Sequence, residues 1–208
     1  GITGGGHSLA MSLASAPLNP AAHFMNELGG LPQAKRLKTR TEQVKAEGAS
    51  CLVKAMQDIY ATIDKTPDSA LMVHDDLYGK AHMASLSSRW DHAGKQQSGS
   101  IVWTPDTTPT YWMVDSQVNF CAWALPTVTL THEDAAALSV LGGILRNGHL
   151  HTAIREKGGA YGAGATQDSS MAVFKFYTYR DPRVEGSFND FAASIDWVLN
   201  MKSGDDLV

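Results

Sequence analysis

The chain has 208 residues, of which 43% are hydrophobic and 18% are charged, and its formal net charge is -4. This length can bury a sizeable core, and this balance is typical of an ordinary soluble protein. Basic residues are scattered except at 35–40, which we interpret as a solvated helix end. No run of about 18 apolar residues predicts a membrane span. We therefore expect neither nucleic acid nor a membrane as a partner.

Glycine and proline punctuate the first 40 residues, and Pro20 predicts the start of a helix that runs to about Leu28. A longer amphipathic helix is predicted over about 41–63, where apolar residues recur at helical spacing. A short buried strand is then expected over 70–73, followed by a helix over about 77–86.

The next region, 92–109, is rich in Gly, Gln, Ser, Thr and Pro and predicts a loop with one small strand at 101–103. Aromatic and β-branched residues make 111–130 the most strand-like part of the chain, and Pro126 predicts a bulge or an edge strand there. Residues 131–134 have the pattern of a capping box that opens a helix.

After Asn147-Gly148, a second short helix is predicted over 149–157, and a strand with alternating faces follows over 172–179. Residues 187–190 have the pattern of another capping box, which opens a final helix. Strands between helices with hairpin returns predict an α+β fold, a two-layer sandwich in which an antiparallel-rich sheet packs on helices.

Histidines and cysteines give no independent catalytic centre. His149 and His151 lie on different sides of a helix and lack a third ligand at useful spacing. Cys51 and Cys121 are far apart and predict buried free thiols, which fit a reducing compartment. No HxxEH or G-x-S-x-G pattern occurs. The sequence therefore predicts no zinc site and no activated nucleophile of its own.

The stretch REKGGAYG joins Arg155 to Tyr161 through two glycines. A guanidinium can grip a carbonyl at two points, and a phenol can donate a hydrogen bond to a forming oxyanion. Gly158 and Gly159 allow a sharp turn, and Gly162 leaves backbone accessible to a ligand. An ordinary helix end, with a glycine cap, Arg155 paired to a neighbour and Tyr161 packed in the sheet, stays open as the alternative.

The resemblance to a known family is carried by the segments HLHTAIREKGGAYGAGA, FKFYTYRDP and SFNDFAASIDW. Together they resemble the last domain of pitrilysin-type zinc metallopeptidases, in particular of the presequence-protease branch. The segment GGGHSLAMSLASAPLNPAAHFMNELGGL is similar to the end of the preceding domain. The resemblance implies that 1–65 is the tail of a preceding homologous domain plus a connecting helix, and that 66–208 is a last α+β domain, incomplete at its C-terminus.

The resemblance also implies a function. Family members are clamshells of two halves that enclose a peptide-degrading chamber, and the first half holds the zinc cofactor. The second half contributes an arginine and a tyrosine that hold the substrate and stabilise the transition state, and these match Arg155 and Tyr161. Gly158, Gly159 and Gly162 would line the substrate. The expected partners are a peptide substrate and the N-terminal half of the same polypeptide.

Because zinc ligands have no counterpart here, we expect the 208-residue chain alone to be inactive. The alternative is a non-catalytic structural or processing-complex subunit of the same fold, and a third interpretation is a free-standing peptide-binding module. The compartment is left open, with the cytoplasm expected if the protein is bacterial.

Overall fold

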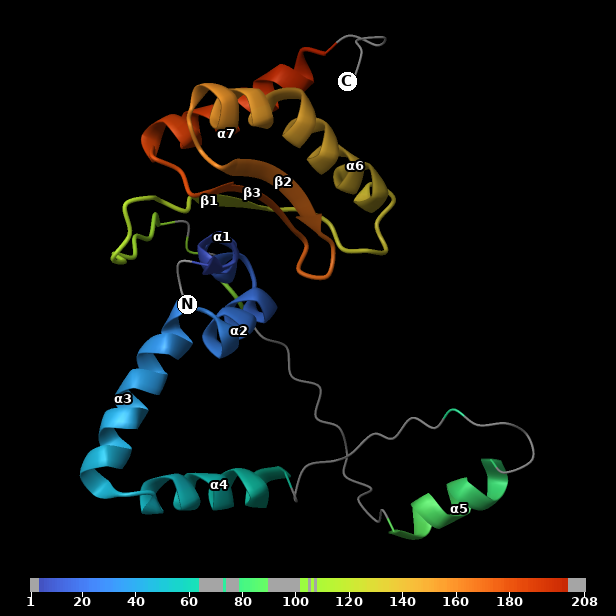
Figure 1. The fold of residues 1–208 in the computed structure, drawn as a ribbon. Helices are drawn as coiled ribbons and strands as arrows, with labels where there is room; N and C mark the ends of the chain where they lie inside the picture. Colours follow the sequence, from blue (N-terminus) through green and yellow to red (C-terminus); the bar gives the residue numbers. More distant parts are fainter. Residues whose placement is uncertain are drawn as a thin grey trace. The chain divides into compact units, whose positions relative to one another are not determined.

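The computed structural model describes residues 4–63, 73, 79–89, 102–104, 106 and 108–201. Contacts divide the chain into two compact units, one formed by Gly1–Arg36 with Val102–Val208 and the other by Leu37–Ile101. In chain order the elements are α1 (Gly6–Ser15), the 3₁₀ turn η2 (Ala16–Leu18), α2 (Pro20–Gly29), α3 (Leu31–Glu47), α4 (Ser50–Ile63), α5 (Gly79–Arg89), β1 (Ala122–Pro126), α6 (Ala135–Leu145), the π-helix η3 (Arg146–Lys157), β2 (Gly162–Asp168), β3 (Val173–Tyr179) and α7 (Glu185–Leu199) (Figure 1).

The first unit is built on a three-stranded antiparallel sheet with the order β1-β3-β2. Helices α6, η3 and α7 cover one face, and α1 lies against the other (Figure 1). The predicted α+β class with an antiparallel sheet packed on helices is confirmed. The boundary predicted between residues 65 and 66 concerns the domains of a longer protein and stays a prediction.

Strand β3 confirms the alternation predicted for 172–179. Phe174, Phe176 and Thr178 are buried on the helix-covered side, whereas Tyr177 and Tyr179 are only half-buried on the other. Pro126 ends β1, which is an edge strand among the described residues, as predicted. An edge tolerates proline because its missing N–H faces away from the ladder.

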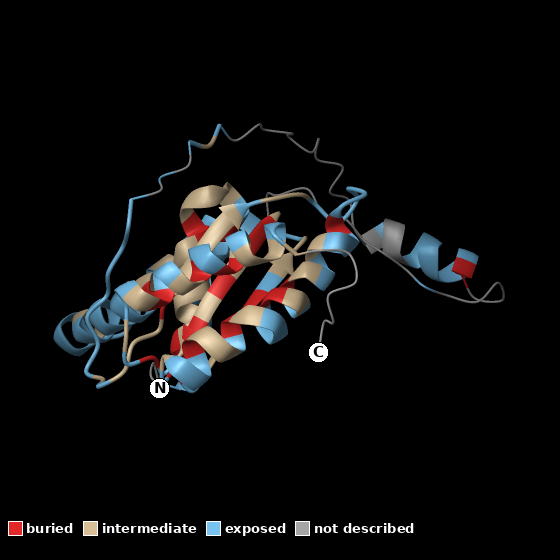
Figure 2. Cartoon of the chain, turned by 90° about the horizontal axis from the view of Figure 1, so that it is seen from above, coloured by how far each residue is buried: buried red, intermediate tan, exposed pale blue. Residues whose placement is uncertain are grey.

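Phe176 lies at the centre of the core. Its ring stacks on Trp123 at 5.8 Å and contacts Phe174 at 5.3 Å and Phe191 of α7 at 5.5 Å between centroids. Leu145, like Phe176 and Phe191, is almost fully buried. Buried positions lie along the strands and on the helix faces next to them (Figure 2). Apolar burial of this kind stabilises each large side chain by roughly 1.5–3 kcal/mol.

The predicted helix break at Asn147-Gly148 is wrong. Helix α6 continues directly into η3 and ends only at Lys157. A β-carbon on Gly148 would collide with the indole of Trp197 on α7. The glycine therefore serves close packing between two helices, and no local signal distinguishes that role from a breaker.

Both predicted capping boxes are wrong. Helix α6 begins at Ala135 after Asp134, which makes no side-chain cap bond. Helix α7 begins at Glu185, so Ser187 lies inside its first turn and donates to the carboxylate of Asp181 instead. In each case a tertiary or turn contact replaced the cap that the local pattern favours.

The single helix predicted over 41–63 is two helices, α3 and α4. They are separated at Gly48, whose φ of 81° ends α3 in a conformation that favours glycine. Of the strand predicted over 70–73, only Val73 is described, and it is exposed and outside any strand. In the strand predicted over 101–103, the described Val102 and Trp103 are also outside regular structure.

Other sequence predictions are confirmed in part. Helix α2 begins at Pro20 as expected, and the Asn19 side chain accepts from the amide of Ala22 at 2.8 Å. Of the region 111–130, only β1 is a strand. The final helix buries Phe191, but Leu199 is exposed. In the described residues, no helix combines the length and apolar character that crossing a membrane requires.

Asp168 closes the β2–β3 hairpin. Its carboxylate accepts from Lys175 Nζ at 2.6 Å, from Ser170 Oγ at 2.7 Å and from the amide of Met171 at 3.2 Å. Burial alone would raise the pKa of Asp168, but these hydrogen bonds and the charge of Lys175 outweigh it, so the pKa is lowered. The hairpin in turn holds α2, because Asn19 Nδ2 donates to the carbonyl of Met171 at 2.7 Å.

Replacing Asp168 by asparagine should lower the free energy of unfolding at pH 7 by about 1.5–3 kcal/mol, the contribution of hydrogen bonds to a charged group. Because the pKa of Asp168 is lowered in the folded state, its carboxylate stabilises the fold at pH values above about 3.9, the ordinary pKa of an aspartate. This stabilisation is lost as the pH falls through the folded-state pKa. The gap between wild type and Asp168→Asn in urea unfolding should therefore close in acid. The exposed Asp58→Asn, which removes only a 3.7 Å pair with Lys54, is the control and should change little.

Two adjacent glycines of α6 offer a matched test of helix–sheet packing. A β-carbon on Gly142 would lie 2.8 Å from the carbonyl oxygen of Ala165 in β2, whereas one on Gly143 would meet nothing within 4 Å. Gly142→Ala should destabilise by about 1–3 kcal/mol through overpacking. Gly143→Ala should stabilise by up to about 1 kcal/mol through helix propensity. Equal effects of the two changes in urea unfolding would contradict this packing.

Candidate functional site

The structure brings Arg155 and Tyr161 together. Arg155 lies in the last turn of η3, and Tyr161 directly precedes β2. The guanidinium carbon of Arg155 is 5.9 Å from the centroid of the Tyr161 ring, within the range of a cation–π contact. The pair lies at the connection between the end of η3 and the start of β2.

A glycine reversal makes this approach possible. Gly159 has a φ of 80°, and its amide donates to the carbonyl of Arg155 at 3.1 Å. The next amide, of Ala160, donates to the carbonyl of Ile154, also at 3.1 Å. These nested bonds close the helix as in a Schellman motif, with a wider span that suits a π-helix. The predicted alternative, a glycine-capped helix end, is therefore present, and it is also what places the two side chains.

Among the described residues, neither the Arg155 guanidinium nor the Tyr161 hydroxyl has an ion-pair or hydrogen-bond partner. Tyr161 is exposed, with 67% of its surface accessible. Its ring packs edge-on against the ring of Tyr179, with the two centroids 5.6 Å apart. Arg155 is exposed too. In the described part of the chain no carboxylate pairs with Arg155. Its expected pairing with a neighbour, part of the purely structural interpretation, is absent from these residues.

The predicted substrate-binding glycines have different surroundings. A β-carbon on Gly158 would collide with the Arg183 guanidinium, and Gly159 is required by its positive φ. Gly162 lies opposite Tyr179 across the hairpin, and a β-carbon there would meet only Tyr179, at 4.0 Å. Packing therefore explains the glycine at 158, and backbone geometry explains the one at 159. A role of Gly158, Gly159 and Gly162 toward substrate stays a prediction.

A group of hydrogen bonds around the buried Asp181 holds the backbone next to the site. Asp181 is fully buried, and its carboxylate accepts from the amide of Arg183 at 2.9 Å and from the hydroxyl of Ser187. Its own amide and carbonyl pair with Asn119 at 2.9 and 2.7 Å. One residue earlier, the carbonyl of Arg180 accepts from the amide of Tyr161 at 3.3 Å. Tyr161 is thus fixed to the end of β3.

Comparison with known proteins identifies the family. Residues 76–204 match the family described as "Peptidase M16 inactive domain". The chain belongs to the M16 peptidase family. It is similar to the proteins named mitochondrial presequence protease from Yarrowia lipolytica (30% identity over 92% of this chain), Danio rerio (30% over 95%) and Xenopus laevis (29% over 98%). The resemblance to the presequence-protease branch of the pitrilysin-type family is confirmed.

The alignments cover 20% of the Yarrowia lipolytica protein and 22% of each vertebrate one. The chain therefore spans about a fifth of the length of these M16 relatives. Their mitochondrial names give no support to the expectation of a bacterial cytoplasmic protein.

Zinc, the metal that the M16 family implies, does not fit the described residues. No group of three or more His, Cys, Asp or Glu side chains in them could hold a metal ion. The His149 ring lies against Trp197, with centroids 5.8 Å apart, and His151 faces Glu156 at 3.3 Å. The two histidines thus have separate partners.

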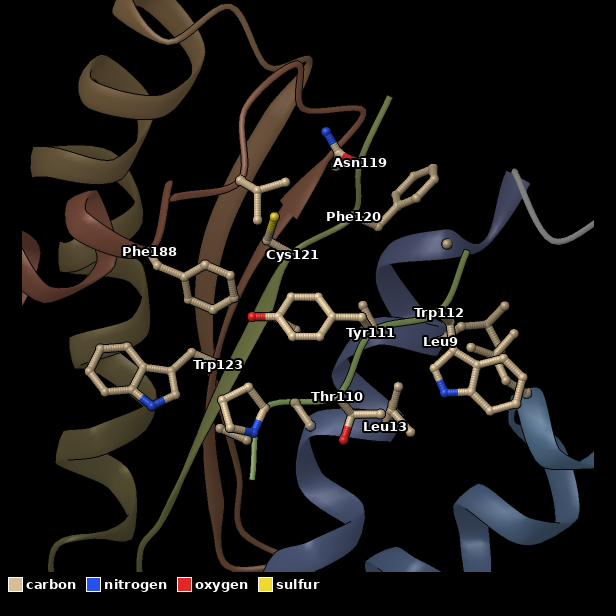
Figure 3. A pocket seen from close by; sticks show the side chains of 18 of the residues that line it. Leu9, Leu13, Thr110, Tyr111, Trp112, Asn119, Phe120, Cys121, Trp123 and Phe188 are labelled. Atoms are coloured by element: carbon tan, nitrogen blue, oxygen red, sulfur yellow. The ribbon is translucent and has the colours of Figure 1, made fainter. Parts of the chain in front are cut away.

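Sequence reasoning missed an apolar groove of about 880 Å³ along the edge of β1 that has no strand partner among the described residues. Leu9 and Leu13 of α1, Trp123 of β1 and Phe188 of α7 line it, and the Tyr111 ring points into it (Figure 3). Cys121 also lines it, and burial raises the pKa of that thiol. The predicted burial holds for Cys121, whereas Cys51 is only partly covered. Neither Arg155 nor Tyr161 borders the groove.

Exchanging the glycines one at a time separates backbone geometry from the predicted contact with substrate. Gly159→Ala forces an L side chain into a positive φ and should cost about 1–2 kcal/mol of stability. Gly162→Ala has room for its methyl group and should leave the thermal midpoint nearly unchanged. A loss of peptide affinity in Gly162→Ala without a loss of stability would support its role toward substrate, and an equal loss of stability in both variants would contradict the packing described above.

Proposed function

We propose that this chain is the substrate-holding part of a zinc endopeptidase that degrades unfolded peptides in an enclosed chamber. Zinc would be bound by the N-terminal half of the same polypeptide, since the described residues offer no site for it. The proposal is supported by the M16 family match and by relatives that are named presequence proteases.

The observation that carries the proposal is the exposed pair of Arg155 and Tyr161, whose polar ends have no partner among the residues that the structure describes. The guanidinium presents planar donors that suit a peptide carbonyl, and the phenol can donate to the oxygen that becomes negative when a peptide bond is attacked. Such donors lower a barrier only if they are held ready before the reaction. The glycine reversal and the bond from Tyr161 to the Arg180 carbonyl provide that rigidity.

The alternative of a non-catalytic structural or processing-complex subunit keeps the same fold. Such a subunit has no need for an unpaired arginine and tyrosine on an exposed face, because free polar ends add nothing to packing. The retained pair therefore favours the peptidase. The presence of an HxxEH sequence elsewhere in the same polypeptide would separate the two functions.

In the full-length enzyme, Tyr161→Phe should lower kcat by about 10²-fold, as expected for loss of an oxyanion donor. Arg155→Lys keeps the charge but loses the planar fork, so it should also lower kcat/KM. Both are measured with a fluorogenic peptide. Tyr60→Phe on α4, where the tyrosine is 70% exposed, is the matched control and should retain full activity.

Unchanged turnover in Tyr161→Phe would remove the proposed role of the phenol. The 208-residue chain alone should not cleave the peptide even with added zinc. Cleavage by that chain, above the level of its own Tyr161→Phe variant, would contradict the assignment of the metal to another part of the polypeptide.

A further inference from the structure

A second exposed arginine lies on the same surface. The guanidinium carbon of Arg180 is 5.5 Å from the centroid of the Tyr179 ring. Tyr179 in turn meets Tyr161 at 5.6 Å, and Tyr161 meets Arg155 at 5.9 Å. Successive contacts thus link the four side chains, from one arginine through two tyrosines to the other arginine, and we call this set the Arg–Tyr row.

The position of Arg180 breaks the pattern of its strand. Side chains alternate along β3, so a further extended residue after Tyr179 would point to the helix-covered face, as Thr178 and Phe176 do. Arg180 instead has a φ of 50°, which is unusual for a residue with a side chain. This left-handed turn keeps the side chain exposed and its guanidinium near the ring of Tyr179.

The strained turn is held from both sides. Asp181, the next residue, is anchored by its bonds to Asn119, Arg183 and Ser187. The carbonyl of Arg180 itself is bound by the amide of Tyr161. A conformation that costs stability and is fixed by its surroundings is typical of functional sites.

The guanidinium of Arg180 has no ion pair among the residues that the structure describes. Its contact with Tyr179 uses a ring face and leaves the planar donors available. The preferred ligand of such a free fork is a carboxylate, which it can bind through two parallel hydrogen bonds.

We propose that Arg180 is a second substrate-binding cation, and that the Arg–Tyr row selects extended peptides that carry a carboxylate a few residues from the bond held at Arg155 and Tyr161. This inference rests on the proposed function. An extended peptide advances about 3.3 Å per residue. The three contacts in the row are each shorter than 6 Å, so the length of the row corresponds to at most about five residues of an extended peptide. The carboxylate is that of an acidic side chain or of a free C-terminus.

The test uses the full-length enzyme and a set of fluorogenic peptides. One series carries a single Glu at successive positions from two to five residues from the cleaved bond, each with a Gln counterpart. A second series ends at the same positions in a free carboxylate or an amide. Arg180→Gln should raise KM about fivefold for the best acidic peptide, with kcat kept and the neutral counterpart changed less than twofold. The series that shows the effect identifies the source of the carboxylate.

Two further variants keep the test sharp. Arg180→Gly relieves the positive φ, so it should fold at least as well as the parent and still show the KM effect. Arg146→Gln, an exposed arginine at the other end of η3, should leave both peptides unaffected. The ratio of kcat/KM for acidic over neutral peptide should also fall as salt rises, and should do so less in Arg180→Gln.

Equal KM changes for acidic and neutral peptides in Arg180→Gln and Arg180→Gly, or no change in either, would overturn the proposal. Failure of this inference and failure of the proposed function are distinguishable, because the proposed function is read in kcat of Tyr161→Phe on both peptides. An enzyme that loses kcat in Tyr161→Phe but shows no acidic preference would keep its function and lose this inference.

Discussion

The buried carboxylate of Asp181 is the constraint on which the described surface depends. A buried carboxyl group is costly unless it is hydrogen-bonded, and here it accepts from the amide of Arg183 just before α7 and from Ser187 in the first turn of α7, while the backbone of Asp181 pairs with Asn119. The end of β3, the entry to β1 and the beginning of α7 are therefore held at one point. From that point the carbonyl of Arg180 reaches Tyr161, so the candidate site inherits its rigidity from a residue that has no contact with substrate in the proposed mechanism.

Local patterns predicted those elements whose causes are local. Pro20 opens α2, and the alternation of Phe174 and Phe176 marks β3, because a proline ring and a pleated strand act through their immediate neighbours. The joining of Arg155 to Tyr161 through glycine was predictable for the same reason.

The sequence could not predict features that depend on distant residues. The local sequence around Gly148 favours a helix break. Only the contact with Trp197 on another helix shows that this glycine allows close helix packing. Ser187 has the sequence pattern of a helix cap, but its hydroxyl donates to the carboxylate of Asp181 instead. The groove along β1 and the turn at Arg180 are likewise products of tertiary contacts, so neither has a sequence signature that a single chain would reveal.

All four members of the Arg–Tyr row, and Asp181 with them, lie in one continuous stretch that contains a helix end and a single hairpin. Contacts between near neighbours in sequence form faster than those that must close long loops. The contacts among the four side chains can therefore form early in folding, whereas Asp181 is anchored only once Asn119 and Ser187, which lie outside the stretch, have docked.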